Sequence, residues 1–184
     1  MLFMHRFLTG ERAYLRALER EDMDEILVWM NDSEIRRLTL AEELPQSGAK
    51  VEELFEKMNK EAIPFARCLN DDRLIGMLRL ALHLRNAIIG ITIGDRAYWS
   101  KGYGTEATVL ALNYCFNTLN LHRVELWVFE FNERAIRCYE KLGFIKEGVS
   151  REAVYKEGRY CNVVNMGILK EEWRATDGKE VTEQ

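Results

Sequence analysis

The sequence predicts a single mixed domain of helices and strands, of the α/β (α+β) class. The chain has 184 residues, which is enough for one substantial core but leaves little room for a second. Its composition, 47% hydrophobic and 30% charged with 2 prolines, is typical of a folded globular protein. Helical and strand-like periodicities both occur, with no internal repeat. We expect residues 1–174 to form the domain and residues 175–184 a polar, disordered tail.

The first third of the chain predicts one strand and two helices. Residues Arg12–Leu18 alternate like a strand, and the acidic pair Glu21-Asp22 then suits a helix N-terminus. Apolar residues recur at helical spacing in both helices: Met23, Ile26, Leu27 and Met30, then Val51, Leu54, Phe55 and Met58. The charged segment 31–48 between them, broken by Pro45, is expected to be either a solvated connection or a cover for a binding site.

Strand patterns dominate the next part of the chain. Residues Phe65–Leu69 and Leu74–Leu82 flank the turn Asn70-Asp71-Asp72 and predict a hairpin. Residues Ala87–Ile93 form another β-rich run, which ends just before a glycine-bearing turn.

That turn leads into a long apolar helix pattern and is a candidate anion site. Gly102 and Gly104 permit unusual backbone conformations, and the first turn of a helix presents free amide groups that suit a phosphate. Lys101 adds charge beside it. A Walker loop is excluded because no Gly-Lys-Ser/Thr ending is present, and a dinucleotide site is disfavoured because Glu125 lies in the middle of its strand.

The last third predicts a strand, a helix and a hairpin. Residues Leu121–Phe131 alternate as a strand, and Asn132 stands at the N-cap of a helix that ends at Gly143. Two further strands follow, Phe144–Tyr155 and Arg159–Leu169, joined by a glycine-containing turn.

Composition excludes several classes of protein. The net charge of -4 gives no basic footprint for nucleic acid. The cysteines are widely spaced and predict neither a zinc site nor a disulfide framework, so no metal is expected; they are Cys68, Cys115, Cys138 and Cys161. No signal peptide or membrane span is recognisable, and a cytoplasmic location is therefore expected.

Two segments carry a resemblance to a known family. They are Tyr98–Ala107, reading YWSKGYGTEA, and Asn132–Phe144, reading NERAIRCYEKLGF, in the right order and at the right interval. The chain resembles the GNAT superfamily of acyl-CoA-dependent N-acetyltransferases, nearest the branch of ribosomal-protein alanine and spermidine acetyltransferases. The resemblance implies a mixed, mostly antiparallel sheet that splays at the acyl-CoA site, with about four helices on its two faces.

The resemblance also implies site residues. The strands Ala87–Ile93 and Leu121–Phe131 would diverge around pantetheine, the turn would hold the pyrophosphate of acetyl-CoA, and Tyr139 would protonate the leaving thiolate. A backbone amide near Ile91 to Ile93 would stabilise the oxyanion. The implied cofactor-binding residues are Ile91, Ile93, Trp99, Ser100, Lys101, Gly102, Tyr103, Gly104, Thr105 and Asn132.

Alternatives remain for several of these residues. The alternative for Asn132 is a role as N-cap alone, and the alternative for Tyr139 is a core residue with a satisfied hydroxyl. Trp99 replaces the Arg or Gln that commonly begins the turn motif, and Ile88 stands where many relatives carry a glutamate base. An acyl-cysteine route through Cys138 is disfavoured because neighbours on a helix point in different directions.

The sequence says least about the acceptor of the acetyl group. A peptide or protein α-amine is favoured over a polyamine or an amino sugar, and a non-catalytic acyl-CoA sensor is the alternative class. Acidic residues of the segment 31–48 offer attraction for an amine; they are Asp32, Glu34, Glu42 and Glu43. A homodimer is expected from the resemblance.

Overall fold

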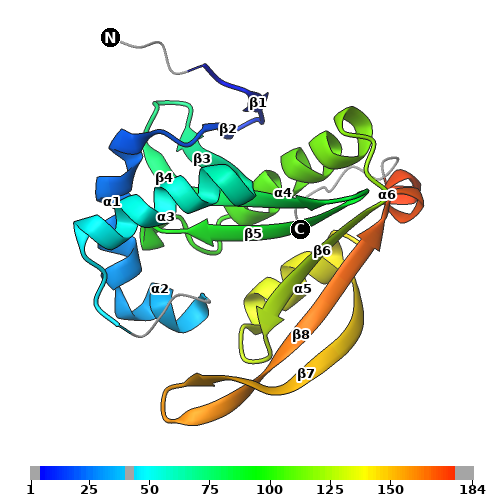
Figure 1. Ribbon diagram of the computed structural model, residues 1–184. Coiled ribbons are helices and arrows are strands. Elements are labelled where there is room, and N and C mark those ends of the chain that lie inside the picture. Colours follow the sequence, from blue (N-terminus) through cyan, green and yellow to red (C-terminus); the bar gives the residue numbers. More distant parts are fainter. Residues whose placement is uncertain (1–4, 40–43, 177–184) are drawn as a thin grey trace.

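A computed structural model describes residues 5–39 and 44–176, and it contains an eight-stranded sheet with helices on both faces (Figure 1). The strand order is β1-β2-β3-β4-β5-β6-β8-β7. The strands are β1 (Leu8–Thr9), β2 (Ala13–Ala17), β3 (Ile63–Leu69), β4 (Leu74–His83), β5 (Asn86–Ile93), β6 (Arg123–Phe129), β7 (Ile145–Lys156) and β8 (Arg159–Leu169). The α-helices are α1 (Met23–Asn31), α2 (Ser33–Leu38), α3 (Gly48–Glu61), α4 (Tyr103–Asn113), α5 (Glu133–Lys141) and α6 (Lys170–Thr176).

The two central strands of the sheet, β5 and β6, pair at one end and diverge at the other. All neighbouring strands are antiparallel except β5 and β6, which are parallel. These two strands pair only where Asn86–Ile88 meets Arg123–Glu125, and past Ile88 they diverge. The predicted mixed, mostly antiparallel and splayed sheet is thereby confirmed.

Each face of the sheet has its own hydrophobic core. On one face, α4 and α5 pack on a cluster that includes Leu78, Leu80 and Leu126, which we call the α4-side core. On the other face, α1, α2 and α3 pack on a cluster that includes Trp29 and Met58, the α1-side core. Alternation along the strands separates the two sets of side chains. The result is a layered molecule whose two helical layers flank the divergence of β5 and β6 (Figure 1).

The predicted strands and long helices are present, and three short elements were missed. These are β1, α2 and α6, so the described residues form six α-helices rather than about four. Segment 31–48, expected to be a solvated connection or a cover for a binding site, contains α2, which Asp32 caps by accepting hydrogen bonds from the amides of Glu34 and Ile35. Residues 40–43 lie outside the described residues.

The ends of two helices differ from the simple pattern. The helix that begins at Tyr103 continues as a π-helical turn over Tyr114–Thr118, where the amide of Leu119 donates to the carbonyl of Tyr114. Helix α6 includes the backbone of Ala175 and Thr176, and the rest of the expected tail, residues 177–184, lies outside the described residues. Across the described helices, none is long and apolar enough to cross a membrane.

Candidate active site

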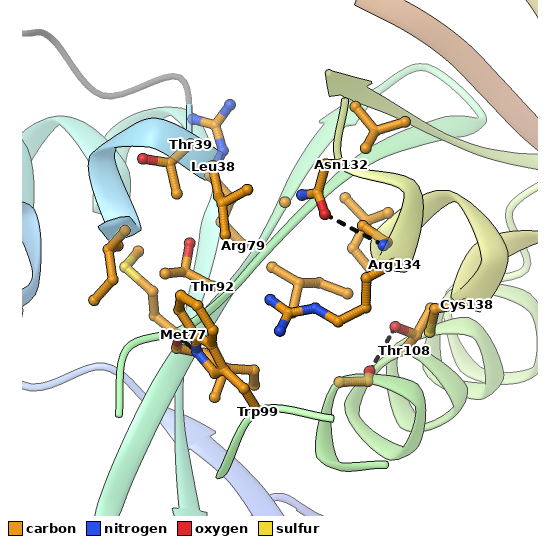
Figure 2. A pocket seen from close by; sticks show the side chains of 18 of the residues that line it. Leu38, Thr39, Met77, Arg79, Thr92, Trp99, Thr108, Asn132, Arg134 and Cys138 are labelled. Atoms are coloured by element: carbon orange, nitrogen blue, oxygen red, sulfur yellow. Dashed lines mark hydrogen bonds between the residues drawn. The ribbon is translucent and has the colours of Figure 1, made fainter. Parts of the chain in front are cut away.

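A cleft of about 600 Å³ opens where β5 and β6 diverge. One wall comes from α1, α2 and α3, and the other comes from the turn before α4 and from α5 (Figure 2). All the predicted site residues line this cleft except Lys101. The ammonium of Lys101 lies instead over the ring of Tyr98, 5.9 Å from its centroid.

The glycine turn shapes the entrance to α4. Gly102 is the N-cap residue with a φ of 79°, in the left-handed region, and Ser100 before it also has a positive φ of 58°. The first helical return bond joins the amide of Glu106 to the carbonyl of Gly102. The amides of Tyr103, Gly104 and Thr105 therefore lack an intrahelical acceptor and point toward the end of the helix.

Space is open above this first turn. A Cβ built on Gly104 would meet no heavy atom within 4 Å. Below it, the buried hydroxyl of Thr108 donates to the carbonyl of Gly104 at 2.8 Å, and the carboxylate of Glu106 accepts from the amide of Arg12 at 2.9 Å. These two hydrogen bonds therefore fix the first turn of α4 on the side away from the cleft, and the side that faces the cleft is open.

Trp99 and Arg134 meet across the cleft. The indole Nε1 of Trp99 donates to the carbonyl of Ile93 at 2.7 Å, and the guanidinium of Arg134 lies 4.5 Å from the ring centroid of Trp99 (Figure 2). The hydrogen bond from Trp99 occupies the carbonyl of Ile93, a residue that was predicted to bind the cofactor. Sequence reasoning missed Arg134, whose only signal is its place in the first turn after Asn132.

The backbone of β5 is free on the side of the cleft. The amide of Gly94 donates to the carbonyl of Ile75 on β4, so alternate residues back along β5 also face β4. The residues between them, including Ile91 and Ile93, face the opposite edge, where β6 has already diverged. An N–H group of this edge is thus available to a bound acyl group.

Tyr139 lies on the cleft side of α5. Its ring packs against Phe144 at a centroid distance of 5.7 Å, and its hydroxyl makes no hydrogen bond to any described residue. Burial, followed by the neighbouring Cys138 thiol, raises the pKa of Tyr139 well above its usual value. The hydroxyl therefore stays protonated at neutral pH and serves as a donor.

Cys138 and Asn132, which line the same wall as Tyr139, make contacts of their own. The Sγ of Cys138 lies 3.1 Å from Oγ1 of Thr105 in α4, and this thiol is half-buried. Asn132 accepts a hydrogen bond from the amide of Ala135 at 3.3 Å, which confirms its N-cap role, and it also lines the cleft.

The wall formed by α1, α2, α3 and β4 is largely apolar. Its side chains include Ile26, Trp29, Met30, Ile35, Leu38, Leu54, Met58 and Met77. Arg79 and Thr39 lie on this side of the cleft, across from Asn132 and Arg134 (Figure 2). Ile88 also lines the cleft, and within residues 5–39 and 44–176 no Asp or Glu does. We call this region the acceptor half.

The acidic residues expected to attract an amine are engaged elsewhere. Asp32 pairs with Arg96 and caps α2, while Glu34 pairs with Arg37 at 2.7 Å. Glu42 and Glu43 lie outside the described residues. In the part of the chain that the structure describes, no cluster of three or more His, Cys, Asp or Glu residues could hold a metal ion.

The comparisons with known proteins agree on one family. A sequence profile of the acetyltransferase (GNAT) domain matches residues 12–145. The spermidine N(1)-acetyltransferase of Escherichia coli K12 is 32% identical over 168 residues, which cover 88% of this chain and 88% of that protein. A Bacillus subtilis protein described as a probable N-acetyltransferase, YjcK, is 34% identical over 174 residues, covering 88% of this chain and 96% of that protein.

A solved structure shows the same fold. The spermidine N-acetyltransferase of Vibrio cholerae, in complex with CoA and spermine, superposes with a TM-score of 0.82 and 31% identity over 90% of this chain and 99% of that chain. The resemblance inferred from the two motif segments is confirmed. The chain belongs to the GNAT family of acetyltransferases, and it is an N-acetyltransferase that uses acetyl-CoA.

Proposed function

We propose that the enzyme acetylates a primary amine by direct attack in a ternary complex, with Tyr139 as the general acid. The observation that carries this proposal is the shared cleft. The free amides of α4, the unpaired edge of β5 and the unused hydroxyl of Tyr139 all border it. Both substrates can therefore meet without a covalent intermediate on the protein.

The rest of the cleft, which we call the cofactor half, is lined by the turn before α4, the free edge of β5 and the start of α5, and it fits the diphosphate and pantetheine of acetyl-CoA. The amides of Tyr103, Gly104 and Thr105 would donate to the diphosphate, and the open space at Gly104 admits it. Asn132 uses its side-chain oxygen as a cap, and its side-chain NH2 is the group we assign to pantetheine. Trp99 and Ser100 would border the same groups, while Lys101 would act only through its charge at a distance.

The reacting groups follow from the same geometry. Acetyl-CoA supplies the acetyl thioester. The amine nitrogen attacks the carbonyl carbon, a β5 amide at Ile91 or Ile93 donates to the oxyanion, and the C–S bond breaks. Tyr139 donates its proton to the departing sulfur, the attacking nitrogen loses a proton to water as the amide forms, and water returns a proton to the tyrosinate. Ile88 cannot accept a proton, so the ammonium form of the acceptor would lose its proton to water or to another carboxylate.

We favour the α-amine of a peptide or protein as the acceptor, because the acceptor half is apolar and the described acids near it are already paired. A polyamine is the second candidate, because spermidine N-acetyltransferases are among the relatives. An assay of acetylated product with a peptide library and with spermidine separates the two candidates.

Calorimetric titration tests the cofactor site. Acetyl-CoA should bind at one site, whereas ATP and NAD serve as controls and should not. If the folded protein did not bind acetyl-CoA, the assignment of this cleft as the acetyl-CoA site would be wrong. Binding without turnover for any amine would favour an acyl-CoA sensor.

Tyr139→Phe tests the general acid. Turnover should fall by roughly 10²-fold, on the scale of general acid effects, with the affinity for acetyl-CoA retained. Tyr160→Phe is the matched control, since Tyr160 is 65% exposed on the β7–β8 hairpin. Unchanged turnover in Tyr139→Phe would exclude Tyr139 from the proton transfer.

We also propose that the protein forms a homodimer and that it is located in the cytoplasm. Sedimentation measures the first, and fractionation measures the second. The β7–β8 hairpin exposes Val149, Tyr155 and Tyr160, which gives a dimer one apolar surface to bury.

A further inference from the structure

The apolar acceptor half contains a cation without a partner. Arg79 lines the cleft beside Leu38 and Thr39 (Figure 2). Its guanidinium forms no hydrogen bond or ion pair with residues 5–39 or 44–176. Arg79 is exposed at the open cleft, so its guanidinium is accessible to a ligand, and its planar fork matches a carboxylate.

The sheet itself positions this side chain. Arg79 on β4 is opposite Gly90 on β5, and a Cβ built on Gly90 would lie 3.3 Å from both Cγ and Nε of Arg79. The arginine stem therefore crosses β5 over a residue that has no side chain. Since β5 borders the cleft, Arg79 extends from the neighbouring strand to the acceptor half on a rigid support.

The charge around Arg79 disfavours a polycation. Within the described residues no carboxylate lines the cleft itself. Glu34, which pairs with Arg37, and Glu133 line the hollow that adjoins the cleft at Trp99 and Arg134. A polyamine would bring several ammonium groups beside the guanidinium of Arg79, and no compensating acid is present among the described residues that line the cleft. A ligand with a carboxylate would instead form a charge-assisted hydrogen bond with the guanidinium.

Resting on the acetyl transfer proposed above, we infer that the acceptor is an α-amine that carries an apolar side chain and a nearby carboxylate. Arg79 binds the carboxylate, and the wall with Trp29, Met30 and Met77 receives the apolar side chain. Two sources share this chemistry. One is a free apolar α-amino acid, and the other is a peptide whose apolar first residue is followed by an acidic one.

The experiment compares matched acceptors with and without the negative charge. The rate of CoA release is measured with leucine and leucinamide, with peptides that begin Leu-Asp and Leu-Asn, and with spermidine. A charge-assisted bond predicts a preference of about 10- to 100-fold in kcat/KM within at least one matched pair. Preference within the amino acid pair identifies the free amino acid, and preference within the peptide pair identifies the peptide.

Two variants then assign the preference to Arg79. Arg79→Met should abolish it while leaving the calorimetric affinity for acetyl-CoA unchanged. Arg159→Met is the control, since Arg159 lies at the exposed β7–β8 turn and should keep the preference. A preference that survives in Arg79→Met would overturn the role of Arg79.

The outcomes separate this inference from the proposed function. If acetyl-CoA does not bind, the proposed function itself fails. If acetyl-CoA binds and spermidine is the best acceptor, or if neither matched pair shows a preference or a reaction, the inference is overturned and the cofactor assignment stands.

Discussion

Replacing Gly94 by alanine tests whether the wall of the acceptor half is rigid. A Cβ built on Gly94 would lie 1.9 Å from Cδ2 of Trp29 and 2.2 Å from its Cε3. Non-bonded carbon atoms rest about 3.5–4.0 Å apart, so the indole ring would have to move by roughly 1.5–2 Å. Trp29 is only 6% exposed and packs in the α1-side core, and this movement would therefore disturb α1.

The cost follows from overpacking. Forcing extra volume into a packed core typically costs about 1–3 kcal/mol. For a chain of this size each kcal/mol lowers Tm by about 2–4 °C, so Gly94→Ala should melt about 2–12 °C below the wild type. Because Trp29 lines the acceptor half, KM for the acceptor should rise more than Kd for acetyl-CoA.

Thermal unfolding followed by circular dichroism measures the first effect. Gly48→Ala is the matched control, since a Cβ at Gly48 would meet nothing within 4 Å and alanine is the better helix former. Its Tm should equal or exceed that of the wild type. A Tm for Gly94→Ala equal to that of the wild type would refute the reasoning, because it would show that Trp29 moves without cost.

Two further predictions concern buried arginines. Arg16 forms two 2.7 Å bonds to the buried Asp22, so Arg16→Met should lower the free energy of unfolding by about 3–5 kcal/mol in a urea titration, and an unchanged midpoint would contradict this. Arg67 is buried with no hydrogen-bond partner in the described structure, and Arg67→Met should raise stability by about 1–3 kcal/mol at neutral pH. Burial lowers the pKa of Arg67 to about 10, so the folded state binds this proton less tightly than the unfolded chain and the destabilisation is full below that pH. A less stable Arg67→Met would mean that its contact with the Tyr103 ring outweighs the desolvation.

The backbone features of the proposed cofactor half could be predicted because they depend on local chemistry. A left-handed Gly102 and a helix with free first-turn amides are readable from the spacing of the glycines before an apolar helix. The cap at Asn132 is equally local. The position of Lys101 was not readable, since a flexible side chain on a turn takes its direction from neighbours such as Tyr98.

The acceptor half could not be predicted because its parts are distant in sequence. Helix α2 spans only Ser33–Leu38, too short to show a helical period. The alternation of β4 does place Arg79 on the face opposite Leu78 and Leu80, but only the folded topology shows that α1 and α3 cover that face. The role of Gly90 depends on the register between two strands.

The two halves of the cleft differ in whether the backbone or the side chains form them, and this difference decides how each substrate can be assigned. Backbone amides form the proposed cofactor half, so we expect it to tolerate changes such as Trp99 at the start of the turn. Side chains from α1, α3 and β4 form the acceptor half, and identities near 32% leave them free to differ from those of the relatives. Family membership therefore determines the acetyl donor, whereas the acceptor has to be inferred from the charge and shape of this cleft, above all from Arg79.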